Sequence, residues 1–149
     1  MKKIAVFGYN RLSFEAISRL DQSDHDILII ETDTSFSALA EDKGFKTKSI
    51  DYRSDEGLKS IGIGKDIDII FCFLPEDSKN VFLTISAREI DENLNIIAIV
   101  DDPQSAEKLI AAGANKIIDP YQICGRKFHE LIKKPDITNI IDHTVFGRH

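Results

Sequence analysis

The sequence is poor in cysteine and has no tryptophan; Cys72 and Cys124 are its two cysteines among 149 residues. Two distant cysteines cannot form the dense disulfide framework that holds small secreted domains together. They also lack the paired spacing of a zinc site. The sequence therefore favours reduced, buried thiols at both positions and argues against a disulfide-stabilised scaffold.

Long hydrophobic runs and an excess of basic charge are also missing. The longest apolar run covers residues 67–74, far short of the roughly 20 residues that span a bilayer. No signal peptide precedes the first strand, so we expect the chain to reside in the cytoplasm, alone or as part of a larger protein. The net charge of −6 and the pI near 5.2 argue against a nucleic-acid partner.

The most informative stretch is the first turn, where apolar residues 4–7 lead into Gly8 and then into a helix with periodic apolar residues. This arrangement is typical of the first unit of a nucleotide-binding fold. Gly8, Asn10 and Ser13 occupy the three glycine positions of G-x-G-x-x-G, in which the second glycine lets a pyrophosphate approach the backbone. Asn10 tolerates the left-handed angles of a tight turn, but its side chain occupies space that phosphates need. Ser13 is small enough for close packing.

A second nucleotide signal is the acid Glu31, which ends the predicted strand at 26–31. It lies 31 − 8 = 23 positions after Gly8, close to the interval of about 20 at which a dinucleotide fold places its ribose-binding acid. The alternative is a solvated acid at a strand end with no ligand.

The rest of the chain alternates strands with helices and contains no hairpin signal. We predict strands at residues 4–7, 26–31, 45–50, 67–74, 96–100 and 116–119. The pattern predicts an α/β fold with a doubly wound, parallel, six-stranded sheet. Right-handed crossovers give a Rossmann-like strand order 3-2-1-4-5-6, followed by a C-terminal crossover helix. Ligands are expected in the crevice above the first and fourth strands.

Helical periodicity predicts which side chains face the core. The helix that begins near residue 77 and the helix after it are expected to bury Val81, Phe82, Ile85 and Ile90, and Ala106, Leu109 and Ile110, respectively. The chain is predicted to divide into a core at 1–119 and a C-terminal part at 120–149. That part holds a helix at 121–134 and a short helical tail whose apolar residues must cover something, on this chain or on another subunit.

Five stretches give the chain a family resemblance: FGYNRL at 7–12, LPEDSKN at 74–80, ARE at 87–89, IIA at 96–98 and AGANKIIDP at 112–120. Together they resemble the RCK domain, also called the TrkA-N domain, in register from about residue 2 to residue 126. These domains regulate potassium channels and potassium transporters of bacteria and archaea. The smaller second subdomain of the family has no counterpart in this sequence.

The resemblance implies a site for an adenine nucleotide or NAD(H). The loop after the first strand would hold the phosphates, with the Arg11 guanidinium paired to one of them. Glu31 would bind the ribose, and Asp51 would lie beside the adenine. The full set of implied nucleotide-binding residues is Gly8, Tyr9, Asn10, Arg11, Leu12, Glu31, Asp51, Tyr52 and Leu74.

Some family members respond to calcium instead, through carboxylates at the ends of the fourth and fifth strands. Asp77 and Asp101 match those positions, with Glu76 and Asp102 adjacent. Ile99 stands where the calcium pattern has a third acid, so the resemblance implies a weak site, because calcium needs several oxygens at once.

The leading hypothesis is a cytosolic, ligand-sensing domain on the inner face of the cell membrane that gates a membrane-embedded potassium channel or transporter. It would act without enzymatic turnover, as a homodimer through the 120–134 helix or as a higher-order ring. The alternative is a stand-alone NAD(P)-binding protein or an oxidoreductase fragment, although 149 residues leave no room for a substrate domain. A receiver domain fits less well, because it has five strands and an acid pair after the first.

Overall fold

The computed structural model describes residues 1–20 and 22–133. The chain divides into two compact units, Met1–Ile118 and Asp119–His149. The first unit carries the whole sheet. Its strands are β1 (Lys2–Phe7), β2 (His25–Ile30), β3 (Lys46–Lys48), β4 (Ile69–Cys72), β5 (Asn95–Ile99) and β6 (Lys116–Ile118).

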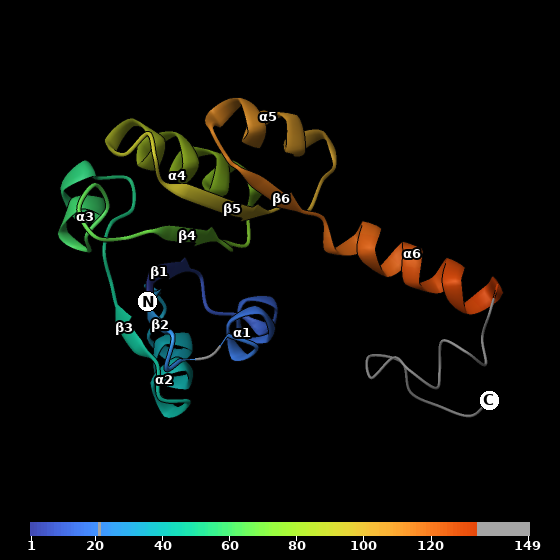
Figure 1. Ribbon diagram of the computed structural model, residues 1–149, viewed down its shortest axis with the longest axis horizontal. Coiled ribbons are helices and arrows are strands. Elements are labelled where there is room, and N and C mark those ends of the chain that lie inside the picture. Colours follow the sequence, from blue (N-terminus) through green and yellow to red (C-terminus); the bar gives the residue numbers. More distant parts are fainter. Residues whose placement is uncertain (21, 134–149) are drawn as a thin grey trace. The chain divides into compact units, whose positions relative to one another are not determined.

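The sheet has six parallel strands in the order β3-β2-β1-β4-β5-β6, as the sequence predicts (Figure 1). Strand β1 pairs with β2 on one side and with β4 on the other, with Val6 opposite Ile29 and Phe71. The order therefore reverses between β1 and β4. This point is the topological switch at which doubly wound sheets bind ligands.

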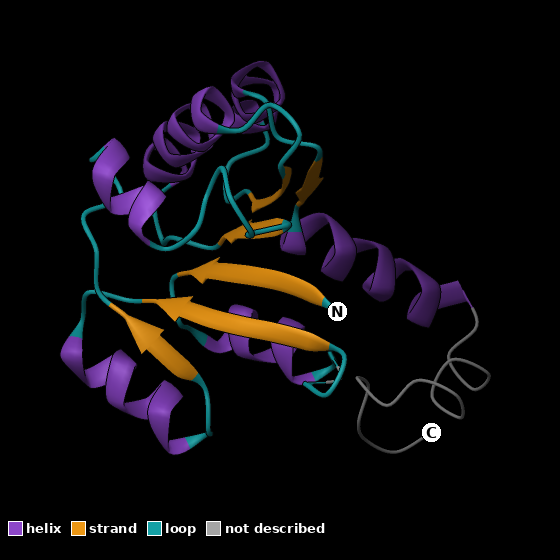
Figure 2. Cartoon of the chain, turned by 60° about the vertical axis from the view of Figure 1, so that its left-hand side comes forward, coloured by secondary structure: helices purple, strands orange, loops and turns teal. Residues whose placement is uncertain are grey.

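Helices of the first unit cover the two faces of the sheet (Figure 2). They are α1 (Arg11–Ser18), α2 (Thr34–Asp42), α3 (Asp55–Ser60), α4 (Asp77–Ile90) and α5 (Gln104–Ala112). Ile17 of α1 and Ala40 of α2 belong to one core cluster. Leu58, Leu83 and Leu109, from α3, α4 and α5, belong to the other. The right-handed crossovers of a doubly wound sheet produce this division, because the chain winds outward from β1 in both directions.

The predicted apolar face of α4 is wrong for Phe82 and Ile85, whereas Val81 and Ile90 pack against the core as predicted. Phe82 and Ile85 are 47% and 42% exposed, and α4 instead buries Asn80, Leu83, Thr84, Ser86 and Ala87. Polar side chains can occupy this face because they are hydrogen-bonded there: the Thr84 hydroxyl donates to the Asn80 carbonyl oxygen at 2.7 Å. On α5, Leu109 is buried as predicted, but Ile110 is 63% exposed.

The two cysteines differ in their surroundings. Cys72 is fully buried in β4, where burial raises the pKa of its thiol to about 12 against a small opposing effect from the Thr84 hydroxyl. Cys124 is exposed, so the prediction of two buried thiols is wrong for this residue. Both cysteines are free.

The described part of the second unit is helix α6 (Pro120–Lys133), which buries none of its described residues. Cys124, Phe128 and Ile132 share one face at helical spacing, and Phe128 is 68% exposed. The predicted helical tail at 137–146 lies outside the described residues. Among residues 1–20 and 22–133, each helix is too short or too polar to cross a bilayer.

Candidate functional site

The turn between β1 and α1 lies at the point where the strand order reverses. Gly8 adopts a φ of +98°, which favours glycine. A Cβ atom at this position would lie 2.6 Å from the carbonyl oxygen of Phe73, which follows β4. The backbone turn therefore packs directly against the end of β4, and Gly8 is required for it.

Asn10 caps helix α1. Its φ of −147° and ψ of −177° are extended, so the position does not use the left-handed angles that we expected asparagine to provide. Its Oδ1 accepts from the Ser13 N–H at 3.0 Å, and the Ser13 hydroxyl oxygen accepts from the Asn10 N–H at 2.8 Å. These two bonds form a capping box, which satisfies N–H groups at the start of the helix.

The other end of the Asn10 side chain reaches β4. Its Nδ2 donates to the Phe73 carbonyl oxygen at 3.0 Å. Asn10 therefore links the β1–α1 turn to the end of β4, across the line where the strand order reverses. The space that a second glycine would leave open is occupied, as the sequence predicts.

Glu31 follows β2 and joins two turns. Its Oε1 accepts from the Tyr9 N–H at 2.8 Å, and its Oε2 accepts from the Asp33 N–H at 3.1 Å. A carboxylate has about four acceptor positions. Glu31 therefore retains acceptor capacity for the hydroxyl groups of a ligand.

The start of α1 retains unused donors. In the described part of the chain, the N–H groups of Arg11 and Leu12 have no acceptor, and the Arg11 guanidinium has no ion-pair partner. Free N–H groups at a helix N-terminus attract anions. The Tyr9 ring packs against Phe14 and Phe45 with ring centroids 6.4 Å apart, and the Tyr9 N–H already donates to Glu31.

The geometry above is that of a doubly wound sheet whose first turn carries Asn10 and Ser13 at the positions of two motif glycines. The family model described as the TrkA-N domain matches residues 4–120. The chain belongs to the TrkA-N domain family. The resemblance found in the sequence is thereby confirmed.

Three known proteins show the range of relatives of this TrkA-N domain. Potassium channel protein 1 of Methanocaldococcus jannaschii is 30% identical over 142 residues, which cover 94% of this chain and 42% of that protein. The TrkA-N domain of the inner membrane protein ybaL from Escherichia coli superimposes with a TM-score of 0.79 at 18% identity, covering 88% of this chain and 96% of that one. The structure of GsuK bound to ADP superimposes with a TM-score of 0.76 at 25% identity, covering 85% of this chain and 33% of that one. This TrkA-N domain thus spans less than half the length of the potassium channel protein.

The remaining predicted nucleotide residues of this TrkA-N domain lie after β3 and β4. The Asp51 carboxylate accepts from the N–H and the Nε of Arg53, at 3.0 Å and 3.1 Å, and the hydrogen bond to the Arg53 side chain is the main cause that lowers the pKa of Asp51. Tyr52 is half-buried and packs against the larger core cluster, and so does Leu74. Both backbone groups of Leu74 bond to the buried Asn80 side chain, at 3.0 Å each, so they are not available to a ligand.

Of the two predicted metal ligands of the TrkA-N domain, Asp77 and Asp101, the carboxylate of Asp77 already accepts two backbone hydrogen bonds. Asp77 Oδ1 accepts from the Asp101 N–H and Oδ2 from the Asp102 N–H, both at 2.9 Å. Within residues 1–20 and 22–133, no three metal-ligating side chains group together. Asp77 therefore joins the start of α4 to the start of α5.

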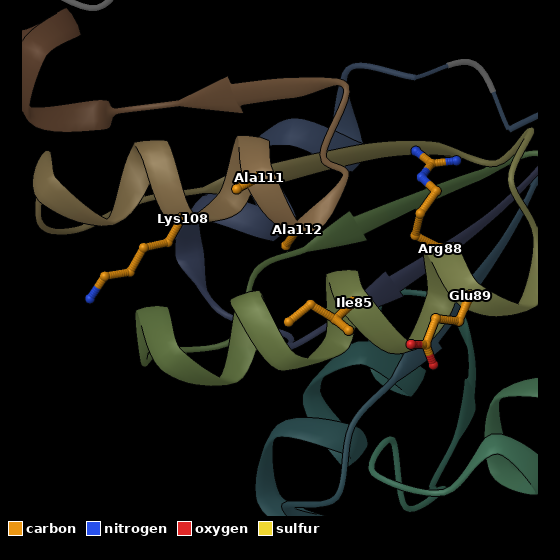
Figure 3. A pocket seen from close by; sticks show the side chains of 6 residues that line it. All are labelled: Ile85, Arg88, Glu89, Lys108, Ala111 and Ala112. Carbon is orange, nitrogen blue, oxygen red and sulfur yellow. The ribbon is translucent and has the colours of Figure 1, made fainter.

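The sequence did not indicate the partners of two side chains of the TrkA-N domain, Asn80 and Arg88. The buried Asn80 side chain holds the β4–α4 turn through both backbone groups of Leu74, and the apolar periodicity of α4 gave no signal for it. Arg88 bonds to the Gly113 carbonyl oxygen through Nε and Nη2, at 3.1 Å and 2.7 Å. Arg88 also lines a cavity of about 520 Å³ beside α4 and α5, together with Ile85, Glu89, Lys108, Ala111 and Ala112. Figure 3 shows the side chains of these residues.

Proposed function

We propose that this TrkA-N domain is a ligand-sensing regulatory domain of a potassium channel or potassium uptake system, located on the cytoplasmic side of the membrane. The relative named potassium channel protein, which matches nearly the whole of this chain, supports this role. The chain itself would supply the sensor, and a membrane-embedded subunit or segment would supply the pore.

The ligand is an adenine nucleotide or NAD(H), bound at the carboxyl edge of β1 and β2. One observation carries this assignment. The unused N–H groups of Arg11 and Leu12, at the start of α1, lie within one helical turn of Tyr9, whose N–H donates to the Glu31 carboxylate. Phosphate oxygens fit the free donors of a helix N-terminus, and ribose hydroxyls fit a carboxylate. The structure of GsuK bound to ADP supports a nucleotide as the ligand. Asp51, Tyr52 and Leu74 would border the adenine.

The domain acts as a homodimer through the 120–134 helix, within a larger ring. Phe128 and Ile132 are exposed on the apolar face of α6. This face supports the assembly, because an exposed apolar stripe on a helix is typical of a surface that packs against a partner. Phe82, Ile85 and Ile110, exposed on α4 and α5, supply a further apolar surface for the ring.

Ligand binding would favour one arrangement of the paired domains over another and so change the open fraction of the pore. The size of that change is limited by the difference in ligand affinity between the two arrangements.

Binding without turnover is the proposed chemistry, in preference to an NAD-dependent oxidoreductase. His25 begins β2 at the edge of the sheet opposite the crevice, and His129 belongs to α6. Calcium at Asp77 and Asp101 is the weaker ligand candidate, because two backbone N–H groups already bond to the Asp77 carboxylate.

The test is titration calorimetry of the full chain with ADP, NAD, NADH and calcium chloride, beside thermal unfolding. A nucleotide present at about 100 times its dissociation constant should add about 2.7 kcal/mol to the free energy of unfolding. Arg11→Gln and Glu31→Gln should each weaken binding, whereas Arg19→Gln, at the end of the same helix, should not. A chain that binds none of the nucleotides contradicts the proposal.

A further inference from the structure

We infer that a second ligand site lies between α1 and α2, for a small molecule that joins an aromatic ring to a carboxylate. The inference goes beyond the proposed function and does not depend on it. It rests on a cavity of about 540 Å³, a volume within the range of about 300–1,000 Å³ that is typical of small-molecule sites. Glu31, Asp51 and Tyr52 do not line this cavity, so it is separate from the crevice that would hold the nucleotide.

The walls of the cavity are aromatic and apolar. Tyr9 and Phe14 line it from the β1–α1 side, with their rings edge to face and their centroids 6.4 Å apart. Phe36 and Leu39 line it from α2, on one face of that helix because they are three residues apart. They are 46% and 54% exposed, so side chains of the described residues do not fill the space beside them. Walls of this kind favour a flat aromatic ring, which packs on them edge to face or offset.

One polar group of the wall has no partner. Tyr9 is 7% exposed, and its hydroxyl makes no hydrogen bond within the described residues. The hydroxyl oxygen is not fully enclosed, because His25 Nδ1 is the one enclosed side-chain N or O atom without a partner in that part of the chain. Tyr9 lines the cavity, so a ligand can reach the hydroxyl there. Burial raises the pKa of Tyr9, which therefore stays protonated at neutral pH and can donate to an acceptor.

Positive charge at the rim of the cavity is only partly compensated. The Arg11 guanidinium and the Lys43 ammonium line the cavity, and neither has an ion-pair partner among residues 1–20 and 22–133. Lys43 Nζ lies 5.8 Å from the centroid of the Phe14 ring, so the ammonium is held beside the aromatic wall. Asp42 is the one acid among the lining residues. A carboxylate on the ring of the ligand therefore suits both the cations of the rim and the Tyr9 donor, whereas a cationic ligand would be repelled.

The test is titration of the isotope-labelled full chain with naphthoate, followed by NMR, beside its neutral analogue naphthylmethanol and beside acetate. Because the ring and the carboxylate are both recognised, naphthoate should bind at least about fivefold more tightly than the alcohol or acetate. The amide signals that move with naphthoate should be those of Tyr9, Phe36 and Lys43. Those of the exposed apolar residues Phe82 and Phe128 should not move.

Four single substitutions locate the site. Tyr9→Phe and Lys43→Gln should each weaken naphthoate binding about two- to tenfold, because each removes one partner of the carboxylate. Asp42→Asn should tighten binding about two- to threefold, because it removes the acid of the rim. The control Lys59→Gln changes an exposed lysine of α3 and should leave the affinity unchanged.

Two of the variants separate this inference from the proposed function. Lys43→Gln should weaken binding of naphthoate and not of ADP, and Glu31→Gln should do the reverse. The inference is wrong if naphthoate does not bind, if it moves the Phe82 or Phe128 signals instead, if the alcohol binds as tightly, or if Lys43→Gln and Asp42→Asn leave the affinity unchanged. In each of these cases, binding of ADP to the wild-type chain still decides the proposed function. If Tyr9→Phe does not fold, the two substitutions at the exposed positions 42 and 43 decide the inference.

Discussion

The side chain of Asn80 satisfies both backbone groups of Leu74. Its Oδ1 accepts from the Leu74 N–H and its Nδ2 donates to the Leu74 carbonyl oxygen, each at 3.0 Å, and the side chain is fully buried. One residue of α4 thus takes the place of a neighbouring strand at the point where β4 has ended. The shape of the turn that borders the crevice depends on this pair.

Asn80→Ala should lower the free energy of unfolding by about 2–4 kcal/mol, because it leaves a buried donor and a buried acceptor without partners. Urea unfolding followed by circular dichroism measures the change. Asn93→Ala, at an exposed position, is the control and should change the value by less than about 0.5 kcal/mol. An equal loss of stability in both variants would show that the two hydrogen bonds between Asn80 and Leu74 do not stabilise the fold.

Gly8→Ala and Gly44→Ala separate backbone strain from steric overlap. Gly44 has a φ of +88° and open space within 4 Å of the point where a Cβ would lie, whereas a Cβ on Gly8 meets the Phe73 carbonyl oxygen at 2.6 Å. Gly44→Ala should cost about 1 kcal/mol for the left-handed conformation. Gly8→Ala should cost about 3 kcal/mol or more, since overlap with a backbone atom is added. Chemical denaturation of the two variants tests this order, and similar costs would count against the close packing at Phe73.

Arg88→Lys should destabilise the chain although the charge is retained. The guanidinium donates to carbonyl oxygens of Gly113, Asp91 and Glu92, and an ammonium cannot reach them together. We expect a loss of about 1–3 kcal/mol in the free energy of unfolding. Arg19→Lys, which changes an exposed arginine paired within its own helix, should be neutral in the same assay.

The buried thiol of Cys72 makes stability depend on alkaline pH. Its pKa is raised from 9.0 to about 12 in the folded chain, so the unfolded chain loses this proton first as the pH rises. The contribution of Cys72 is complete below pH 9 and declines between pH 9 and about 12. The measurement is urea unfolding of a Cys124→Ser variant across this range, compared with the same variant carrying Cys72→Ala, which should lack this component of the decline.

The same Cys124→Ser variant should react with a disulfide reagent at pH 8 only after unfolding, since the thiolate is the reactive form. Rapid labelling of the folded chain would contradict the burial of Cys72.

The proposed dimer predicts that Phe128→Asp yields a smaller particle. An aspartate on the apolar face of α6 would place an unpaired charge in the interface. Light scattering coupled to size exclusion measures the mass of the particle. Gln122→Asp, on the polar side of the same helix, should leave the mass unchanged. A wild-type chain that is already monomeric at high concentration would remove the basis for this assembly.

The strand order and the helix positions could be predicted because each depends on local pattern. Apolar runs such as 67–74 mark buried parallel strands, and Ser54 and Gly113 mark helix ends, so alternation and handedness leave few topologies. The buried face of α4 could not be predicted, because periodicity counts Phe82 and Ile85 as core residues and cannot anticipate that Asn80 and Thr84 find partners inside.

The positions of the β1–α1 turn and of Glu31 were predictable, and their hydrogen bonds were not. The spacing of Gly8, Asn10 and Ser13 located the turn, and the interval to Glu31 located a second group beside it. That Glu31 would accept from Tyr9, and that Asn10 would bond to Phe73, depends on distances between strands that are far apart in the sequence. No local pattern reports such distances.

The bonds from Glu31 to Tyr9 and Asp33 mean that the two turns around the crevice are assembled before any ligand arrives. A preorganised pocket needs little ordering on binding, so binding gains affinity but produces little movement within the pocket itself. Under the proposed function, the response to a ligand would then arise where the outer edge of the ligand meets a neighbouring subunit. Sensing would then be a property of the proposed assembly, and an isolated chain would change its conformation very little when it binds a nucleotide.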